Sequence, residues 1–180
     1  MAGYGPMVPL GIAPNGQPLA NFVDRLLAYL IDSAILFGVA LVVEIPVIII
    51  AVLSLVHSQA VDADGTVNDA SPAFFLAVLA VAGGLMIVNI AVTYVYHVEM
   101  MYRSGQTVGK RAMKLRIVCL DPGTPMTRAT AAKRWLIGQV ATAIVGIAGL
   151  IDGLWQLWDQ PYRQCLHDKV ARTVVVKQAT

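Results

Sequence analysis

The sequence predicts an all-α membrane protein with two transmembrane helices, a third membrane-embedded helical segment and a small cytoplasmic β element. Three observations lead to this prediction. Only 13% of the 180 residues are charged and 57% are hydrophobic, whereas a soluble domain carries about 25% charged residues. The apolar residues stand in long runs, and the basic residues gather in one loop. We therefore expect the lipid bilayer to be the main solvent of this chain.

The amino-terminal segment, residues 1–20, is rich in Gly and Pro and carries no charge. Such a segment is a poor helix and a poor core, so we expect extended or disordered chain unless a partner orders it. It lacks the basic start of a signal peptide, although the later triplet Ser58-Gln59-Ala60 resembles a cleavage site. We expect an uncleaved membrane anchor.

The first apolar run predicts a helix over residues 24–56, which is longer than the ~20 residues that a membrane span needs. Pro46 lacks a backbone donor and is expected to kink this helix. Glu44 would then lie near the far interface. Residues 47–56 would tilt, lie along the membrane surface or pack on another chain.

An acidic loop follows, and Ser71-Pro72 is typical of an N-cap and first helical position. We expect the second transmembrane helix over residues 72–97 and a basic loop over residues 98–134. From Met100 onward, this loop contains one acidic residue, Asp121, and eight basic residues. The basic residues are Arg103, Lys110, Arg111, Lys114, Arg116, Arg128, Lys133 and Arg134. The positive-inside rule places this loop and the amino terminus in the cytoplasm of a prokaryotic cell, with the chain as a multi-pass plasma-membrane protein.

Residues 135–158 form a third apolar stretch that is bounded by tryptophans. The sequence leaves two paths open for it: a full span, or a re-entrant or interfacial hairpin that returns to the cytoplasm. Charge in the tail, residues 159–180, favours the hairpin. "MKLRIVCL" and "RTVVVK" read as short strands that pair only if the tail returns to the cytoplasmic side.

Three motifs in order resemble the RDD family of small integral membrane proteins, over residues 21–177. They are "RLLAYLID" from Arg25, "GQTVGKR" from Gly105 and "LHDKVARTVVV" from Leu166. The family is named for one arginine and two aspartates, which correspond to Arg25, Asp32 and Asp168, with Asp152 as the second candidate for the last. Arg172 stands where the family often has glycine. The resemblance implies a role in transport but no defined chemistry.

An ionisable side chain inside a span costs about 2.5–3.5 kcal/mol and indicates a functional site. The spacing of Asn89, Thr93 and His97 places them on one face of the second helix. If His97 lies at the depth of Arg25, Asn89 lies level with Asp32. We therefore predict an intramembrane polar cluster and a set of cytoplasmic motif residues. The cluster is Arg25, Asp32, Asn89, Thr93 and His97, and the motif residues are Gly105, Thr107, Gly109, Lys110, Arg111, His167 and Asp168.

The cluster has two interpretations, hydrogen bonds that fix helix register or a relay for a proton or an ion. Two function hypotheses follow: a transport protein that acts as a homo-oligomer or in a larger complex, or a non-catalytic accessory or assembly subunit. We expect no catalytic residues, no metal ligands, no cofactor and no nucleic-acid partner, since no metal-ligand spacing or nucleophile–base pair is present.

Overall fold

The computed structural model describes residues 11–57, 64, 72–144 and 146–178. The chain divides into two compact units. The paired-helix unit is residues 34–93, and the mixed unit is residues 1–33 together with 94–180. The acidic loop lies largely outside the described residues.

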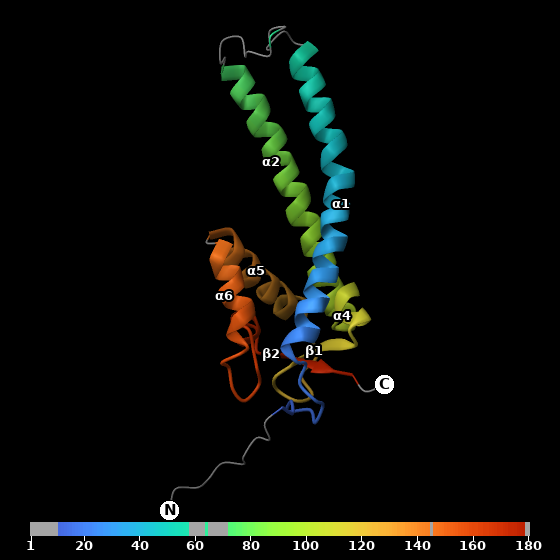
Figure 1. Cartoon of the computed structure of the whole chain (residues 1–180), viewed down its shortest axis with the longest axis vertical. Coiled ribbons are helices and arrows are strands. Elements are labelled where there is room, and N and C mark those ends of the chain that lie inside the picture. The colour runs from blue at the N-terminus through green and yellow to red at the C-terminus, as the bar shows by residue number, and fades with distance from the viewer. Residues whose placement is uncertain (1–10, 58–63, 65–71, 145, 179–180) are drawn as a thin grey trace, which may run out of the picture. The chain divides into compact units, whose positions relative to one another are not determined.

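Helix α1 (Phe22–His57) is 36 residues long, and α2 (Pro72–Tyr94) is 23 residues long. They supply the paired-helix unit, in which they run antiparallel (Figure 1). Both are long and apolar enough to cross a membrane. Pro46 lies inside α1 without ending it, and the helix is continuous to His57. Residues 47–56 therefore belong to the same helix, and the kink expected at Pro46 stays a prediction.

The second helix also continues beyond its predicted end. After α2 the chain forms a π-helical turn, η1 (Val95–Glu99), and then α3 (Met100–Ser104). Helical backbone thus persists to Ser104, seven residues after His97. Gly105, at φ 70°, adopts the left-handed conformation that ends this helix.

The mixed unit contains η1, α3 and a set of short elements. These are α4 (Val108–Ala112), β1 (Leu115–Cys119), α5 (Arg128–Ile144), α6 (Gly146–Trp155), α7 (Leu166–Val170) and β2 (Thr173–Lys177). Strands β1 and β2 pair antiparallel, with Leu115 opposite Lys177 and Cys119 opposite Thr173. The predicted two-stranded element is therefore present.

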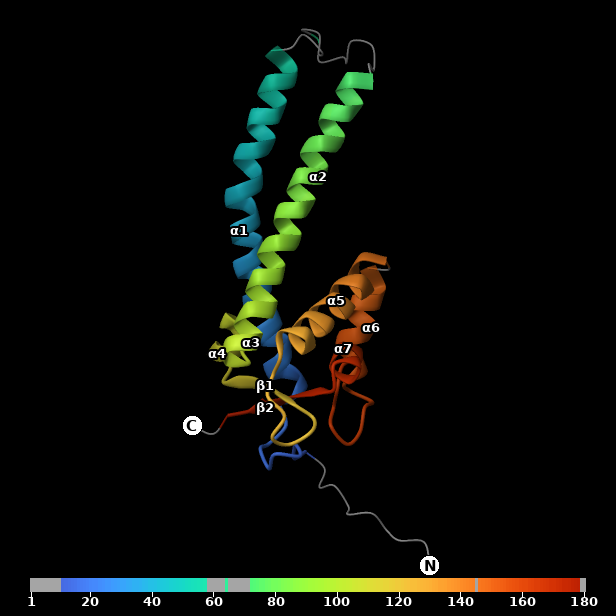
Figure 2. The same ribbon diagram turned by 180° about the vertical axis from the view of Figure 1, so that it is seen from behind.

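The strand pairing bears on residues 135–158, which belong to α5 and α6, an antiparallel pair of helices (Figures 1 and 2). Paired strands must lie on one side of a membrane, so a single crossing between β1 and β2 is incompatible with the sheet. Neither α5 nor α6 reaches the length of a span. The return of the tail, which the hairpin interpretation requires, agrees with this geometry.

Strands β1 and β2 are both preceded by a short helix and a left-handed residue. Each follows a five-residue helix, and the residue before each strand has a positive φ: Lys114 at 55° and Arg172 at 52°. The left-handed conformation is the one that glycine adopts most readily. At Arg172, where the family often has glycine, this chain therefore keeps a glycine-like turn despite the side chain.

Residues 11–20 form no helix, as expected, and they are ordered by contacts with their own chain; residues 1–10 lie outside the described ones. Leu19 bridges to Val176 of β2, and Ala20 donates its N–H to the Val175 carbonyl at 2.9 Å. Ala13, Leu19 and Ala20 are buried. A segment of low hydrophobicity is ordered here because β2 offers it an open edge for hydrogen bonding.

Candidate functional site

Asp32 of α1 is enclosed by polar groups of the mixed unit and is only 3% exposed. Its Oδ1 accepts hydrogen bonds from the Gly109 N–H at 2.7 Å and the Tyr96 hydroxyl at 2.6 Å. Its Oδ2 accepts one from the Thr107 hydroxyl at 2.5 Å. Lys110 Nζ lies 3.7 Å from Oδ2 and supplies a positive charge. The carboxylate is thus paired and hydrogen-bonded, as a buried charge must be.

The close approach of α4 to Asp32 depends on Gly109. A Cβ atom at this position would lie 2.2 Å from the Ala28 carbonyl oxygen and 2.8 Å from Asp32 Oδ1. Only glycine therefore allows the backbone N–H to reach the carboxylate. Burial lowers the pKa of the neighbouring Lys110, and the charge of Arg134 adds to this effect, whereas Asp32 opposes it.

Asp168 of α7 is fully buried and lies between two arginines. Arg25 Nη1 is 3.2 Å from its Oδ2, and Arg134 pairs with its Oδ1. Its Oδ2 also accepts the Cys165 N–H at 3.1 Å, which caps α7. Burial alone would raise the pKa of Asp168, but Arg134, His167 and Arg25 outweigh it and hold the pKa at about 2. The residue is an ionised carboxylate at neutral pH.

His167 connects this cluster to α6. Its backbone N–H donates to Asp152 Oδ1 at 2.9 Å, and its ring Nδ1 contacts Asp152 Oδ2. The ring Nε2 lies 3.0 Å from Arg134 Nη2. Arg25 thus contacts Asp168, whereas Asp152 contacts His167.

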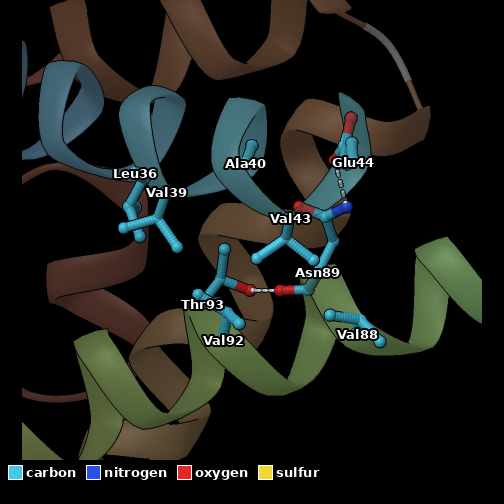
Figure 3. A pocket seen from close by; sticks show the side chains of 9 residues that line it. All are labelled: Leu36, Val39, Ala40, Val43, Glu44, Val88, Asn89, Val92 and Thr93. Atoms are coloured by element: carbon cyan, nitrogen blue, oxygen red, sulfur yellow. Dashed lines mark hydrogen bonds between the residues drawn. The ribbon is translucent and has the colours of Figure 1, made fainter. Parts of the chain in front are cut away.

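Asn89 and Glu44 form a separate pair in the paired-helix unit (Figure 3). Asn89 Nδ2 donates to Glu44 Oε1 at 2.6 Å and to the Leu85 carbonyl at 3.1 Å. The Thr93 hydroxyl donates to the Asn89 carbonyl at 2.8 Å. These groups line a cavity of about 30 Å³ whose other walls are apolar. A space of this size holds about one water molecule.

The predicted link between Asp32 and Asn89 is wrong. Asp32 takes its partners from η1 and the segment around α4, and Asn89 takes Glu44. The prediction used His97 as the cytoplasmic end of the second helix, but the helix continues to Ser104. Residues of the second helix were therefore assigned to the wrong depth. The His97 ring instead contacts the Tyr96 ring edge to face, with 5.2 Å between centroids.

The remaining motif residues have structural positions in the mixed unit. A Cβ at Gly105 would lie 2.9 Å from the Ile117 carbonyl oxygen, so this turn packs directly on β1. Arg111 has an exposed side chain and is absent from the ion pairs of the described residues. Asp168 pairs with Arg25 and Arg134 instead.

The sequence analysis did not identify Tyr96 as a partner of Asp32, Arg134 as a partner of Asp168 or Glu44 as a partner of Asn89. Tyr96 lies three residues after Thr93, and a phenol at the end of a span is a usual donor to a buried acid. Arg134 directly precedes the apolar stretch that begins at Trp135, and this position was a signal of burial. In the basic loop, however, that signal was read as topology only.

One group of potential metal ligands occurs among the described residues. Cys165, His167 and Asp168 offer ligand atoms within 4.8 Å of one another. Burial raises the pKa of the Cys165 thiol to about 12, so the thiolate that a metal needs is disfavoured. Two arginines already neutralise Asp168. These residues therefore do not fit a cation.

The sequence profile of the RDD family matches residues 19–172 of this chain. No curated protein and no solved structure matches it significantly. The matched region covers most of the chain and includes Arg25, Asp32 and Asp168, which the structure places in two adjoining polar clusters of the mixed unit. The chain therefore belongs to the RDD family and carries its membrane-protein domain.

Proposed function

We propose that this protein transports a proton or a small cation across the membrane, with Glu44 and Asn89 as the groups that bind it. The observation that carries the proposal is a carboxylate in a transmembrane helix whose hydrogen-bond partner is a neutral amide. In this proposal Arg25, Asp32 and Asp168 have a different role: they hold the mixed unit together. The transport site therefore moves from the cluster expected around Asp32 to Glu44.

The position of Glu44 along α1 supports this assignment. Asp32 and its donors mark the polar end of the helix, and the apolar run that follows is residues 33–56. At about 1.5 Å per residue these 24 residues measure about 36 Å, close to a bilayer core of about 30 Å. Glu44 is the twelfth of the 24 (44 − 32 = 12). It would lie near the middle of the membrane rather than at the far interface.

The charge balance supports it as well. Asp32 pairs with Lys110, and Asp168 pairs with Arg25 and Arg134. Within the described part of the chain, Glu44 makes no such ion pair, and its contact is the Asn89 amide. A carboxylate in hydrocarbon without a fixed counter-ion must bind a proton or a mobile cation. Because an amide has both a donor and an acceptor, Asn89 can donate a hydrogen bond to the ionised Glu44 carboxylate and can accept one from the protonated acid.

Two spans do not enclose a pathway, so transport requires a homo-oligomer or a larger complex. Glu44 and Asn89 are each half-buried within their own chain. Covering them with a second copy would remove their polar atoms from contact with lipid, which is the usual environment of intramembrane ionisable groups. We assign the site to an interface between protomers.

The proposed orientation places the mixed unit in the cytoplasm and the loop between α1 and α2 outside the cell. The excess of basic residues between η1 and α5 supports this topology under the positive-inside rule. Cys165 is buried, so Cys119, which is half-buried, is the better reporter. A membrane-impermeant thiol reagent should label Cys119 in inverted vesicles and leave it unlabelled in intact cells.

Reconstitution tests the transport proposal. The purified protein is placed in vesicles that contain a pH-sensitive dye, and a gradient of Na⁺ or K⁺ is imposed. Wild type should drive a change in internal pH, Glu44→Gln should abolish it, and Asp121→Asn, which alters an exposed ion pair with Arg172, should leave it unchanged. Equal flux in wild type and Glu44→Gln would refute the assignment.

A second candidate function is that of a non-catalytic accessory or assembly subunit. It is favoured by the small size of the cavity at Glu44, about 30 Å³, which is no continuous path. In this case Glu44 and Asn89 would bond to polar groups of another membrane protein. Wild-type vesicles would then show no flux, and the protein would co-purify with fixed partners.

A further inference from the structure

Helix α6 and the turn after it have an inverted distribution of polarity. Their buried side chains are polar: Asp152, Gln156 and Asp159 are 6%, 7% and 8% exposed. Their exposed side chains are large and apolar, with Trp158 at 74%. The exposed set is Leu150, Ile151, Leu154, Trp155, Leu157 and Trp158. A helix at a water-facing surface shows the opposite arrangement.

The buried polar groups have partners inside the mixed unit, which fixes the orientation of α6. Asp152 accepts the His167 N–H, and Asp159 accepts the Gln164 N–H at 2.8 Å and pairs with Lys169. Gln156 donates to the Gly153 carbonyl at 2.7 Å. The Gln156 bond is local, whereas the contacts of Asp152 with His167 and of Asp159 with Lys169 reach α7. These two contacts hold the apolar face outward, and rotation of the helix to hide it would break them.

Three features indicate that lipid covers this face. The chain carries two membrane-length helices, so a bilayer is always nearby. Helix α5, which precedes α6, packs on the end of the second span, where the Trp135 and Tyr94 rings meet edge to face at 5.4 Å. Tryptophans are also enriched where hydrocarbon meets headgroups. Trp155 ends α6 and Trp158 lies in the turn after it, and the cation Arg163, five residues later, is exposed.

We propose that the apolar face of α6, from Leu150 to Trp158, is immersed in one leaflet of the bilayer and anchors the mixed unit to it. With 10 residues, α6 is about 15 Å long and enters one leaflet only. The polar side of α6 stays against α7, and Arg163 and Lys169 lie at headgroup level, where anionic phosphates attract them. This inference does not depend on the role of Glu44.

The three tryptophans of the chain, Trp135, Trp155 and Trp158, allow a direct test. Single-tryptophan variants, with the other two replaced by phenylalanine, are reconstituted in phosphatidylcholine–phosphatidylglycerol vesicles. Lipids brominated near the headgroup should reduce the emission of Trp158 and of Trp155 at least twofold. Lipids brominated near the chain ends should quench them less, and aqueous iodide should have little effect.

Strong quenching of Trp158 by iodide, without quenching by brominated lipid, would overturn the proposal, because the face would then lie in water. Protection from both quenchers would also overturn it and would assign the face to a second copy of the chain. If a variant fails to fold, the unmodified protein serves instead. With three tryptophans of comparable emission, a loss of more than half of the total in brominated lipid requires that Trp155 or Trp158 is in contact with lipid.

Discussion

Two acids on the same helix show how differently a membrane protein treats a buried carboxylate. Asp32 lies in the mixed unit with three hydrogen-bond donors and the charge of Lys110. Glu44 lies twelve residues later in the paired-helix unit with one neutral amide as its partner. The first carboxylate is fully compensated by its own chain. Among the described residues the second has a neutral amide and no cation as its partner, and the transport proposal rests on this difference.

The largest loss of stability is expected for Gly109→Ala, which introduces a steric clash next to Asp32. The new Cβ would lie 2.2 Å from the Ala28 carbonyl oxygen, and backbone cannot yield as a flexible side chain does. We expect a loss of more than 4 kcal/mol in the free energy of unfolding, or no folded protein. Thermal unfolding in mild detergent measures it. Gly138→Ala is the control, since its Cβ would meet no atom within 4 Å apart from its chain neighbours and the backbone of its own helix. A stable Gly109→Ala protein would contradict the geometry.

Asp168→Asn should cost about 3–5 kcal/mol, because it leaves Arg25 and Arg134 buried without a counter-charge. Asp121→Asn removes an exposed ion pair with Arg172 and should change stability by less than about 0.5 kcal/mol. Both are measured by denaturant unfolding in the same detergent. If the two variants unfold alike, the Asp168 cluster is not the structural centre of the mixed unit.

Lowering the pH should reduce the stability of the mixed unit, because Asp168 becomes protonated. Its folded pKa of about 2 lies below the unfolded value of 3.8, so its contribution is complete above about pH 4 and is lost as the pH falls towards 2. The shift corresponds to roughly 2 kcal/mol. The thermal midpoint, followed from pH 6 to pH 2, should fall over this window, and Asp121→Asn should keep the same profile. A midpoint that is constant between pH 5 and pH 2.5 would contradict the assignment.

The smallest effect on stability is expected for Glu44→Gln. The amide of Gln still accepts the hydrogen bond from Asn89, and a charge is removed from an apolar helix. We expect a change within about 1 kcal/mol in the unfolding free energy, while flux is lost. Should this variant lose 3 kcal/mol or more, Glu44 would be a structural residue like Asp32, and the contrast between the two acids would disappear.

The sequence predicted the elements with a strong periodic or compositional signal. Both long helices and the pairing of the two short strands are confirmed by the structure. The resemblance to the family motif pointed to Asp32 and Asp168, which the fold buries, and to Arg25, which pairs with Asp168. Their partners were not predictable in the same way. Thr107 and Arg134 come from distant segments, and contacts across 75 and 34 residues depend on tertiary packing rather than on local spacing.

The error at Asn89 has a specific physical cause. The depth of a residue in a helix is counted from the helix end, and hydropathy locates that end only to within a few residues. A turn of π-helix at Val95–Glu99 also changes the face that later residues present. Glu44 and Asn89 are both polar residues within apolar runs. Their pairing could be predicted only by counting depth from the end of the helix at Ser104.

The unbroken course of α1 has a geometric consequence. Successive residues of an α-helix are about 100° apart, so the twelve positions from Asp32 to Glu44 amount to three turns and about 120°. The side chains of Asp32 and Glu44 therefore leave α1 on different faces. A substitution on the face of one acid leaves the face of the other unchanged.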